Sequence, residues 1–505
     1  MKQLYFFIIL LSLTSCSDWL DFEPESNRTT DNFYKTPYQM EQALNGVYNG
    51  LLPLAHYYLM LSDVRSDDVW TTTSTSSQHD YVDISTFTDQ IYVDATIDDA
   101  WKSYYVIINR ANTFLEKITT IHMADGVQEK FAGEARFLRA LAYFELVRNF
   151  GRVPVVTKTI TVDEAMSIPQ SEAKDVYETA IIPDLEYAID VLDDEIYNYK
   201  GETGGVGRAT QTAAQSLLAR VYLTMAGFPL NDTDKLIQAK EMCEAVIQKA
   251  ESSGKYFAKT GSDWERLWIS DNDNKYHIFE IQYTCAKGMG NTMVFYATPK
   301  VSKDYTHLSM SGYSISAADA LVSLYDDNDI RKNATISTTY DGFFTKFFEH
   351  KIKRASLGFP DIDNEIVDRT YFPINYPILR FEDIMLMYAE IDATINGFPS
   401  QKSIELVNRI RVRAGLEKLT SEQSSSNNFL MEVDNERRRE LAGEGIRWYD
   451  IVRHNTWQTL LKEKFEKNTS NGNYSGNIKD GRHLLPIPDN QIKTKKGLYN
   501  QNPGW

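Results

Sequence analysis

Two stretches near the end of the chain decide the fold. Residues 482–505 read RHLLPIPDNQIKTKKGLYNQNPGW, and residues 435–453 read NERRRELAGEGIRWYDIVR. The first combines three prolines with apolar Leu498, Tyr499 and Trp505. Proline lowers the entropy lost when a segment becomes ordered, so this tail is predicted to dock on the body of the protein.

The second stretch concentrates arginines, acids and aromatics on what its pattern predicts to be a helix. The break at 443–445, Gly-Glu-Gly, predicts a corner within it. Its charged side chains could form an anion-binding site, but an internal ion-pair network is favoured because arginine binds carboxylates and carbonyls through several donors. The residues concerned are Arg437, Arg438, Arg439, Glu440, Glu444, Arg447, Asp450 and Arg453.

The other end of the chain carries a secretion signal. Lys2 precedes the apolar run 4–11, LYFFIILL, which is too short to span a bilayer, and Leu13-Thr14-Ser15-Cys16 follows. This pattern predicts a signal peptide over residues 1–15 and a lipid anchor on Cys16. The alternative is an ordinary cleavable signal followed by a chance cysteine.

Composition restricts the partners. The formal net charge is −17, and removal of the signal with Lys2 makes it −18, which disfavours nucleic acid and anionic lipid surfaces. The chain contains 30 Tyr, 24 Phe and 8 Trp, a content suited to carbohydrate or peptide recognition or simply to core packing. Cys243 lies on an apolar helical stripe and is predicted to be buried; its pairing with Cys285 stays open.

Helical periodicity dominates the rest of the chain. Thr210 and Asp234 are predicted N-caps, Gly151 a helix end, and Trp101 a core residue. The pairing of these helices is typical of tetratricopeptide-like units. The predicted helices are 99–118, 129–150, 172–193, 211–226, 235–250, 378–396 and 401–414.

Two segments lack a helical period: 66–98, which is polar and studded with aromatics, and 256–376, which contains the extended run 276–284. The prediction is a mostly α scaffold carrying long irregular insertions. A soft boundary near residue 255 separates regions 16–255 and 256–505 of one compact body. Long loops on a rigid frame usually hold the function.

The first insertion supplies the candidate ligand-binding residues. Trp70 and Tyr81 are predicted to stack on a ligand on an exposed face, with Asp67 and His79 as hydrogen-bonding neighbours, and Tyr296 from the second insertion is a weaker candidate. Sugar rings have apolar faces that pack on aromatics. For each aromatic, a place in the core is an equally good interpretation.

Catalytic patterns are missing from the sequence. It has no HExxH motif, no G-x-S-x-G motif and no phosphate-binding glycine loop, so neither a metal nor a cofactor is predicted. Acid doublets such as Asp67-Asp68 do not define the separated carboxylates of a glycosidase.

Further stretches carry a family resemblance. Residues 134–155, EARFLRALAYFELVRNFGRVPV, then 376–390, YPILRFEDIMLMYAE, and 407–416, VNRIRVRAGL, precede the two C-terminal segments in order. With the Cys16 motif, this set resembles the SusD/RagB family of nutrient-binding lipoproteins. The resemblance implies a SusD-like helical fold and lipid attachment at the outer face of the outer membrane. It also implies action beside a TonB-dependent, SusC-like transporter, with no catalytic activity.

Two classes of function therefore remain. The first is a non-catalytic surface protein that binds oligosaccharide or polysaccharide, with peptide as the main alternative ligand. The second is a secreted hydrolase on a helical scaffold. The ordered family-like segments favour the first.

Overall fold

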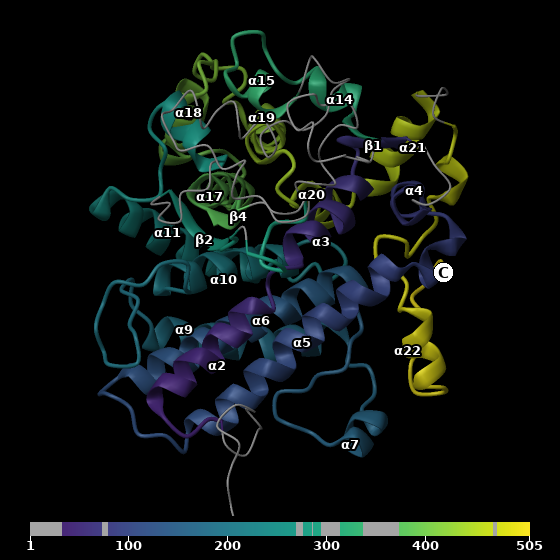
Figure 1. The fold of residues 1–505 in the computed structure, drawn as a ribbon. Coiled ribbons are helices and arrows are strands. Elements are labelled where there is room, and N and C mark those ends of the chain that lie inside the picture. Colours follow the sequence, from purple (N-terminus) through teal and green to yellow (C-terminus); the bar gives the residue numbers. More distant parts are fainter. Residues whose placement is uncertain are drawn as a thin grey trace, which may run out of the picture.

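The computed structural model describes residues 33–72, 79–268, 276–284, 286–293, 314–336, 373–467 and 472–505. Within them the protein is mostly helical, and its four strands form two separate two-stranded ribbons. Figure 1 shows most of the N-terminal helices in the lower half of the view and most of the C-terminal helices in the upper half.

Long helices build the N-terminal half. They pair in sequence order, α5 against α6 and α10 against α11, as the tetratricopeptide-like pattern predicts (Figure 1). Their apolar stripes supply most of the core in this half. Long and short together, the helices of this half are α2 (Pro37–Asn49), α3 (Leu54–Leu61), α4 (His79–Thr86), α5 (Ala95–Ile118), α6 (Val127–Phe150), α7 (Val162–Ser167), α8 (Ala173–Val176), α9 (Ile182–Val191), α10 (Gln211–Ala226) and α11 (Lys235–Ser253).

The helix ends test the capping predictions. Thr210 accepts a hydrogen bond from the Ala213 N–H at 3.2 Å, and Gly151 ends α6 with φ +66°, so both predictions are confirmed. Asp234 was predicted as an N-cap, but its backbone is already helical and its side chain makes no capping bond, so that prediction is wrong.

Two segment predictions also need correction. The insertion 66–98 contains α4, and α5 begins at Ala95 rather than at residue 99. The predicted helix 172–193 is divided between α8 and α9 by a π-helical turn at Tyr177–Ile181. Trp101 and Cys243 are buried, as predicted.

The C-terminal half packs α17 against α11, which joins the two halves. The predicted helix 378–396 begins as a strand: β4 (Tyr376–Arg380) pairs antiparallel with β2 (His277–Ile281), in the run predicted to be extended. The helices here are α12 (Gly261–Glu265), α14 (Asp319–Val322), α15 (Arg331–Thr335), α17 (Phe381–Asn396), α18 (Gln401–Arg413), α19 (Ser426–Leu441), α20 (Arg447–Arg453), α21 (Trp457–Lys467) and α22 (Asp489–Thr494).

The predicted corner at 443–445 is confirmed, and it separates α19 from α20. Gly445 has φ +71°, and a Cβ there would lie 2.6 Å from the side chain of Tyr58. Its N–H donates to Asp63 Oδ2 at 2.8 Å. Glycine is required here because both the backbone conformation and the close contact exclude a larger residue.

The C-terminal tail docks, as predicted. The Asn502 amide donates to the carbonyls of Phe150 and Leu485, at 2.8 and 2.7 Å. Trp505 Nε1 donates to the Leu484 carbonyl at 3.0 Å, and the guanidinium of Arg482 lies 4.3 Å from the Trp505 ring centroid. The tail therefore closes over the end of α6.

Candidate functional site at the β1–β3 ribbon

The two insertions meet in a short ribbon. β1 (Val69–Thr72) pairs antiparallel with β3 (Ser314–Ala317), and the Ala318 N–H donates to the Asp68 carbonyl at 2.7 Å. Thr72 pairs with Ser314, so the end of the first insertion's strand and the start of the second's lie side by side. The structure thus brings the 66–92 segment next to the second insertion.

Buried ion pairs hold the start of β1. The Asp67 carboxylate accepts two bonds from Arg447, at 2.8 and 3.0 Å, and Asp68 pairs with Arg438. Burial disfavours the charge on Asp67, but Arg447 and Arg438 outweigh that effect and hold its pKa below the usual range. Lys464 donates to the Ser66 carbonyl at 2.7 Å. Asp67 is therefore engaged within the protein.

Trp70 packs into the body instead of lying open. It is only 7% exposed, with Phe465 of α21 edge-on at 5.7 Å and the Lys464 ammonium 4.8 Å from its ring centroid. Burial lowers the pKa of Lys464 to about 8. The exposed position predicted for Trp70 is wrong, because β1 lies against α21 and its ring fills the space between them.

Tyr81 on α4 is also only 7% exposed and belongs to the main core, 6.1 Å from the His56 ring. The exposed position predicted for it is likewise wrong. Contact of Asp67, Trp70 or Tyr81 with a ligand is not tested by this burial and stays a prediction. The His79 side chain, Tyr296 and Cys16 lie outside the part of the chain that the structure describes.

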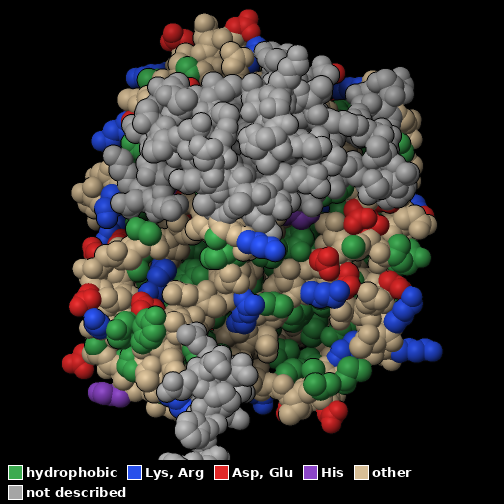
Figure 2. Space-filling view, in the orientation of Figure 1, with side chains coloured by type: hydrophobic (Ala, Val, Ile, Leu, Met, Phe, Trp, Pro, Cys, Tyr) green, Lys and Arg blue, Asp and Glu red, His purple; other side chains and the backbone are tan. Residues whose placement is uncertain are grey.

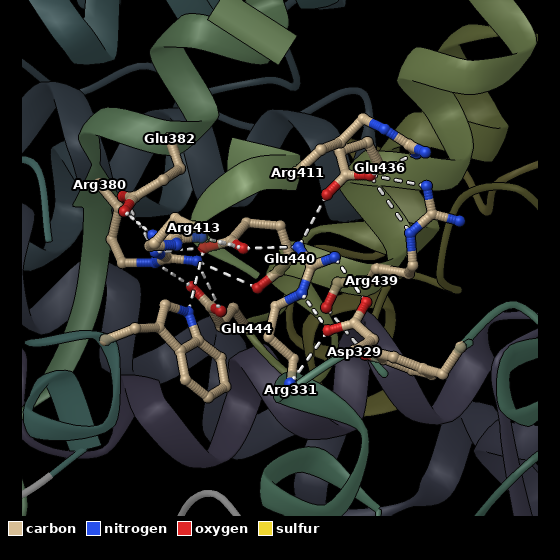
Figure 3. Close-up of polar contacts among 12 residues, drawn as sticks. Asp329, Arg331, Arg380, Glu382, Arg411, Arg413, Glu436, Arg439, Glu440 and Glu444 are labelled. Atoms are coloured by element: carbon tan, nitrogen blue, oxygen red, sulfur yellow. Dashed lines mark hydrogen bonds and ion pairs between the residues drawn. The ribbon is translucent and has the colours of Figure 1, made fainter. Parts of the chain in front are cut away.

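The arginine-rich stretch forms the predicted ion-pair network (Figure 3). Glu440 of α19 is its centre: it accepts from Arg331 at 2.8 Å, from Arg380 at 3.0 Å and from Arg413. Arg380 also pairs with Glu444 at 2.7 Å. All these side chains are buried, so the network is internal and these residues offer no open anion site.

A cleft of about 530 Å³ lies beside this network and contains carboxylates. Glu390 pairs with both Arg453 and His454, and Asp434 pairs with Arg447 at 2.9 Å. Burial disfavours the charge on Glu390, but Arg453 and His454 hold its pKa well below the usual range. The general acid of a glycosidase needs the opposite shift, so Glu390 is not suited to that role.

Sequence reasoning missed the partners that fix this site. Arg447 lies 380 residues after Asp67 in the sequence, and Lys464 lies 398 residues after Ser66. The arginines were visible as a cluster, but no local signal links them to a particular acid.

None of the helices in the described part of the chain combines the length and the apolar character that a membrane span requires.

Paired helices, a docked tail and short ribbons define a scaffold of tetratricopeptide-like units with inserted loops. Two family models match this chain: one described as the SusD family over residues 256–505, and one described as starch-binding, associating with the outer membrane, over residues 18–223. The chain belongs to the SusD family.

Individual relatives agree with that assignment. A SusD-like protein of Bacteroides ovatus is 28% identical, over 90% of this chain and 82% of its own. The crystal structure of a SusD homologue from Bacteroides thetaiotaomicron is 23% identical, with a TM-score of 0.78 over 95% of this chain and 99% of its own. The structure of a laminarin-binding SusD-like protein is 25% identical in sequence and has a TM-score of 0.73. The match covers 94% of this chain and 100% of that protein's chain.

Proposed function

We propose that this SusD-family protein binds oligosaccharide or polysaccharide at the cell surface without altering it, and delivers it to a TonB-dependent outer-membrane transporter. The observation that carries the proposal is family membership across both halves of the chain, one half matching a model described as starch-binding. The laminarin-binding relative, which shares the fold, supports carbohydrate as the ligand class.

The proposed ligand face lies at the end of the β1–β3 ribbon where Thr72 pairs with Ser314. Two observations support this location. The ribbon joins both polar, aromatic-rich insertions, and its base is fixed by the ion pairs of Asp67 and Asp68. A ligand site needs such a rigid support, because binding weakens when its side chains must first be ordered. His79 and Tyr296 are the proposed contacts.

The proposed attachment is a lipid on Cys16. Residues 16–32 would reach at most about 60 Å if fully extended, so residue 33 would stay within that distance of the bilayer. Such a tether would keep the ligand face near a transporter in the same membrane. An acidic protein that belongs to the SusD family fits a role as one component of a transport complex.

Calorimetric titration with a panel of soluble oligosaccharides tests the ligand face. His79→Ala and Tyr296→Ala should each weaken binding and leave the melting temperature unchanged. For Tyr296, as a stacking aromatic, the expected loss of binding free energy is about 1–3 kcal/mol. Tyr38→Ala, at an exposed tyrosine of α2, is the matched control. Normal binding by both variants would show that the ligand site lies elsewhere. Binding of peptides instead of glycans would contradict the proposal that the ligand is a carbohydrate.

A further inference from the structure

A second concave surface is lined by α5, α7 and the C-terminal tail, and Figure 1 shows α5 and α7 below the β1–β3 ribbon. It is a groove of about 720 Å³ between α5, the segment 154–168 with α7, and the C-terminal tail. Its floor is one stripe of α5, made of Trp101, Tyr105, Ile108 and Asn112.

The wall opposite α5 is fixed by hydrogen bonds to its backbone. Tyr105 Oη donates to the Pro154 carbonyl at 2.8 Å, and the Asn112 amide donates to the Val156 carbonyl at 2.8 Å. Lys495 donates to the Ala165 carbonyl of α7. The groove is therefore preformed, with its shape set by α5 and the docked tail.

The rim of the groove exposes apolar side chains. Val162 of α7 is 79% exposed and Val106 of α5 is 42% exposed, and both line the groove. No residue of α7 is buried, and a helix of so few residues gains little from its own hydrogen bonds. Exposed apolar surface around a concavity is typical of a site that another molecule covers. Figure 2 shows hydrophobic side chains gathered on this lower part, with Lys and Arg among them.

The charged residues that line the groove indicate the charge of the molecule that covers it. In a protein with net charge −17, no Asp or Glu lines the groove, whereas Lys102, Arg110 and Lys495 do. Lys102 is paired with Asp98, but Arg110 and Lys495 have no carboxylate partner within the described ranges. Lys495 is only 9% exposed; its ammonium donates to the Ala165 carbonyl and lies 5.7 Å from the centroid of the Tyr499 ring, and neither contact is anionic. A carboxylate would complete its environment.

We propose that this groove docks an acidic segment of another protein, with an apolar side chain packed against Val106 and Val162 and with carboxylates that face Lys495 and Arg110 separately. The rim favours peptide over sugar, because its exposed apolar side chains, Val106 and Val162, are aliphatic. The site is separate from the proposed ligand face and does not depend on glycan binding.

Site-specific photocrosslinking in the cells that make the protein tests this. A benzophenone amino acid at Val106 or Val162 should crosslink one and the same partner, through a peptide that is net acidic and contains an apolar residue. The same probe at Ile237 of α11, which is 61% exposed, should give none of it. Arg110→Glu and Lys495→Glu should each cut the yield about tenfold, and Lys495→Arg should preserve it.

Melting temperatures show whether each variant folds. If Lys495→Glu fails to fold, Arg110→Glu still tests the proposal, because Arg110 is exposed and its replacement should not disturb the fold. Four results would overturn the proposal: no crosslink at either rim position, a crosslink to a second copy of this chain, a basic or uncharged crosslinked peptide, or a yield unaffected by the charge reversals.

Discussion

Replacing Glu440 by Gln removes one negative charge from the centre of the buried network and leaves the side-chain shape almost unchanged. Three guanidinium groups, those of Arg331, Arg380 and Arg413, then lose an anionic acceptor, and the indole N–H of Trp264, 3.2 Å away, keeps at best a neutral one. Breaking a buried ion pair by removing one partner costs about 3–5 kcal/mol. The other acids remain around these arginines, so we expect a loss within that range.

Guanidinium chloride unfolding at pH 7 measures the change. Glu463→Gln is the matched control, because Glu463 pairs with Lys467 on the surface of α21 and such pairs contribute less than about 0.5 kcal/mol. Burial disfavours the Glu440 charge, but Arg413, Arg380 and Arg331 hold its pKa below the usual range. Its contribution is thus present above the unfolded pKa and lost as pH falls. A Glu440→Gln protein whose free energy of unfolding lies within about 1 kcal/mol of the wild-type value would refute the reasoning. A loss that small is what an ordinary hydrogen bond contributes.

Other variants test separate parts of the structure. Trp70→Ala should destabilise the fold by about 3–5 kcal/mol, measured by denaturant unfolding, because the ring is buried against Phe465; unchanged stability would show that the ring is not core. Cys16→Ala should move folded protein from the membrane to the soluble fraction, and retention in membranes lacking the transporter would contradict the lipid anchor. Burial lowers the pKa of His483 to about 4, with Arg65 adding to the effect, so His483 destabilises the fold increasingly as pH falls from 6.5 to 4. His483→Gln should recover up to about 3 kcal/mol at pH 4.5 relative to pH 7, whereas His122→Gln at an exposed position should not; equal pH profiles would reject this assignment.

Sequence periodicity predicted long paired helices such as α10 and α11 because each has an apolar stripe, whereas α2, α3 and α21 were not predicted. α10 begins and ends at the predicted residues, and Thr210 caps it as expected. The strand β4 was missed because its residues 376–379 are all apolar, and over so few residues such a pattern cannot be told from the helix that follows. Asp234 has the right residue type for a cap but lies in helical backbone, a feature that only the structure reveals.

The candidate site was harder to predict. The ribbon joins Val69–Thr72 to Ser314–Ala317, and pairing across such a separation leaves no local trace in either strand. Trp70 stands in a polar segment that looks solvent-facing, yet α21 covers it. For the arginines of α19 and α20 the sequence favoured an ion-pair network, and it could not name their partners.

The most direct test of the proposed function mixes the mature protein with soluble polysaccharides and measures binding and reducing ends in the same samples. Titration calorimetry reports binding, and a reducing-sugar assay after prolonged incubation reports cleavage. The proposal predicts saturable binding to at least one glycan with no release of reducing ends above the protein-free control. Release of reducing ends would contradict it, and so would binding confined to peptides.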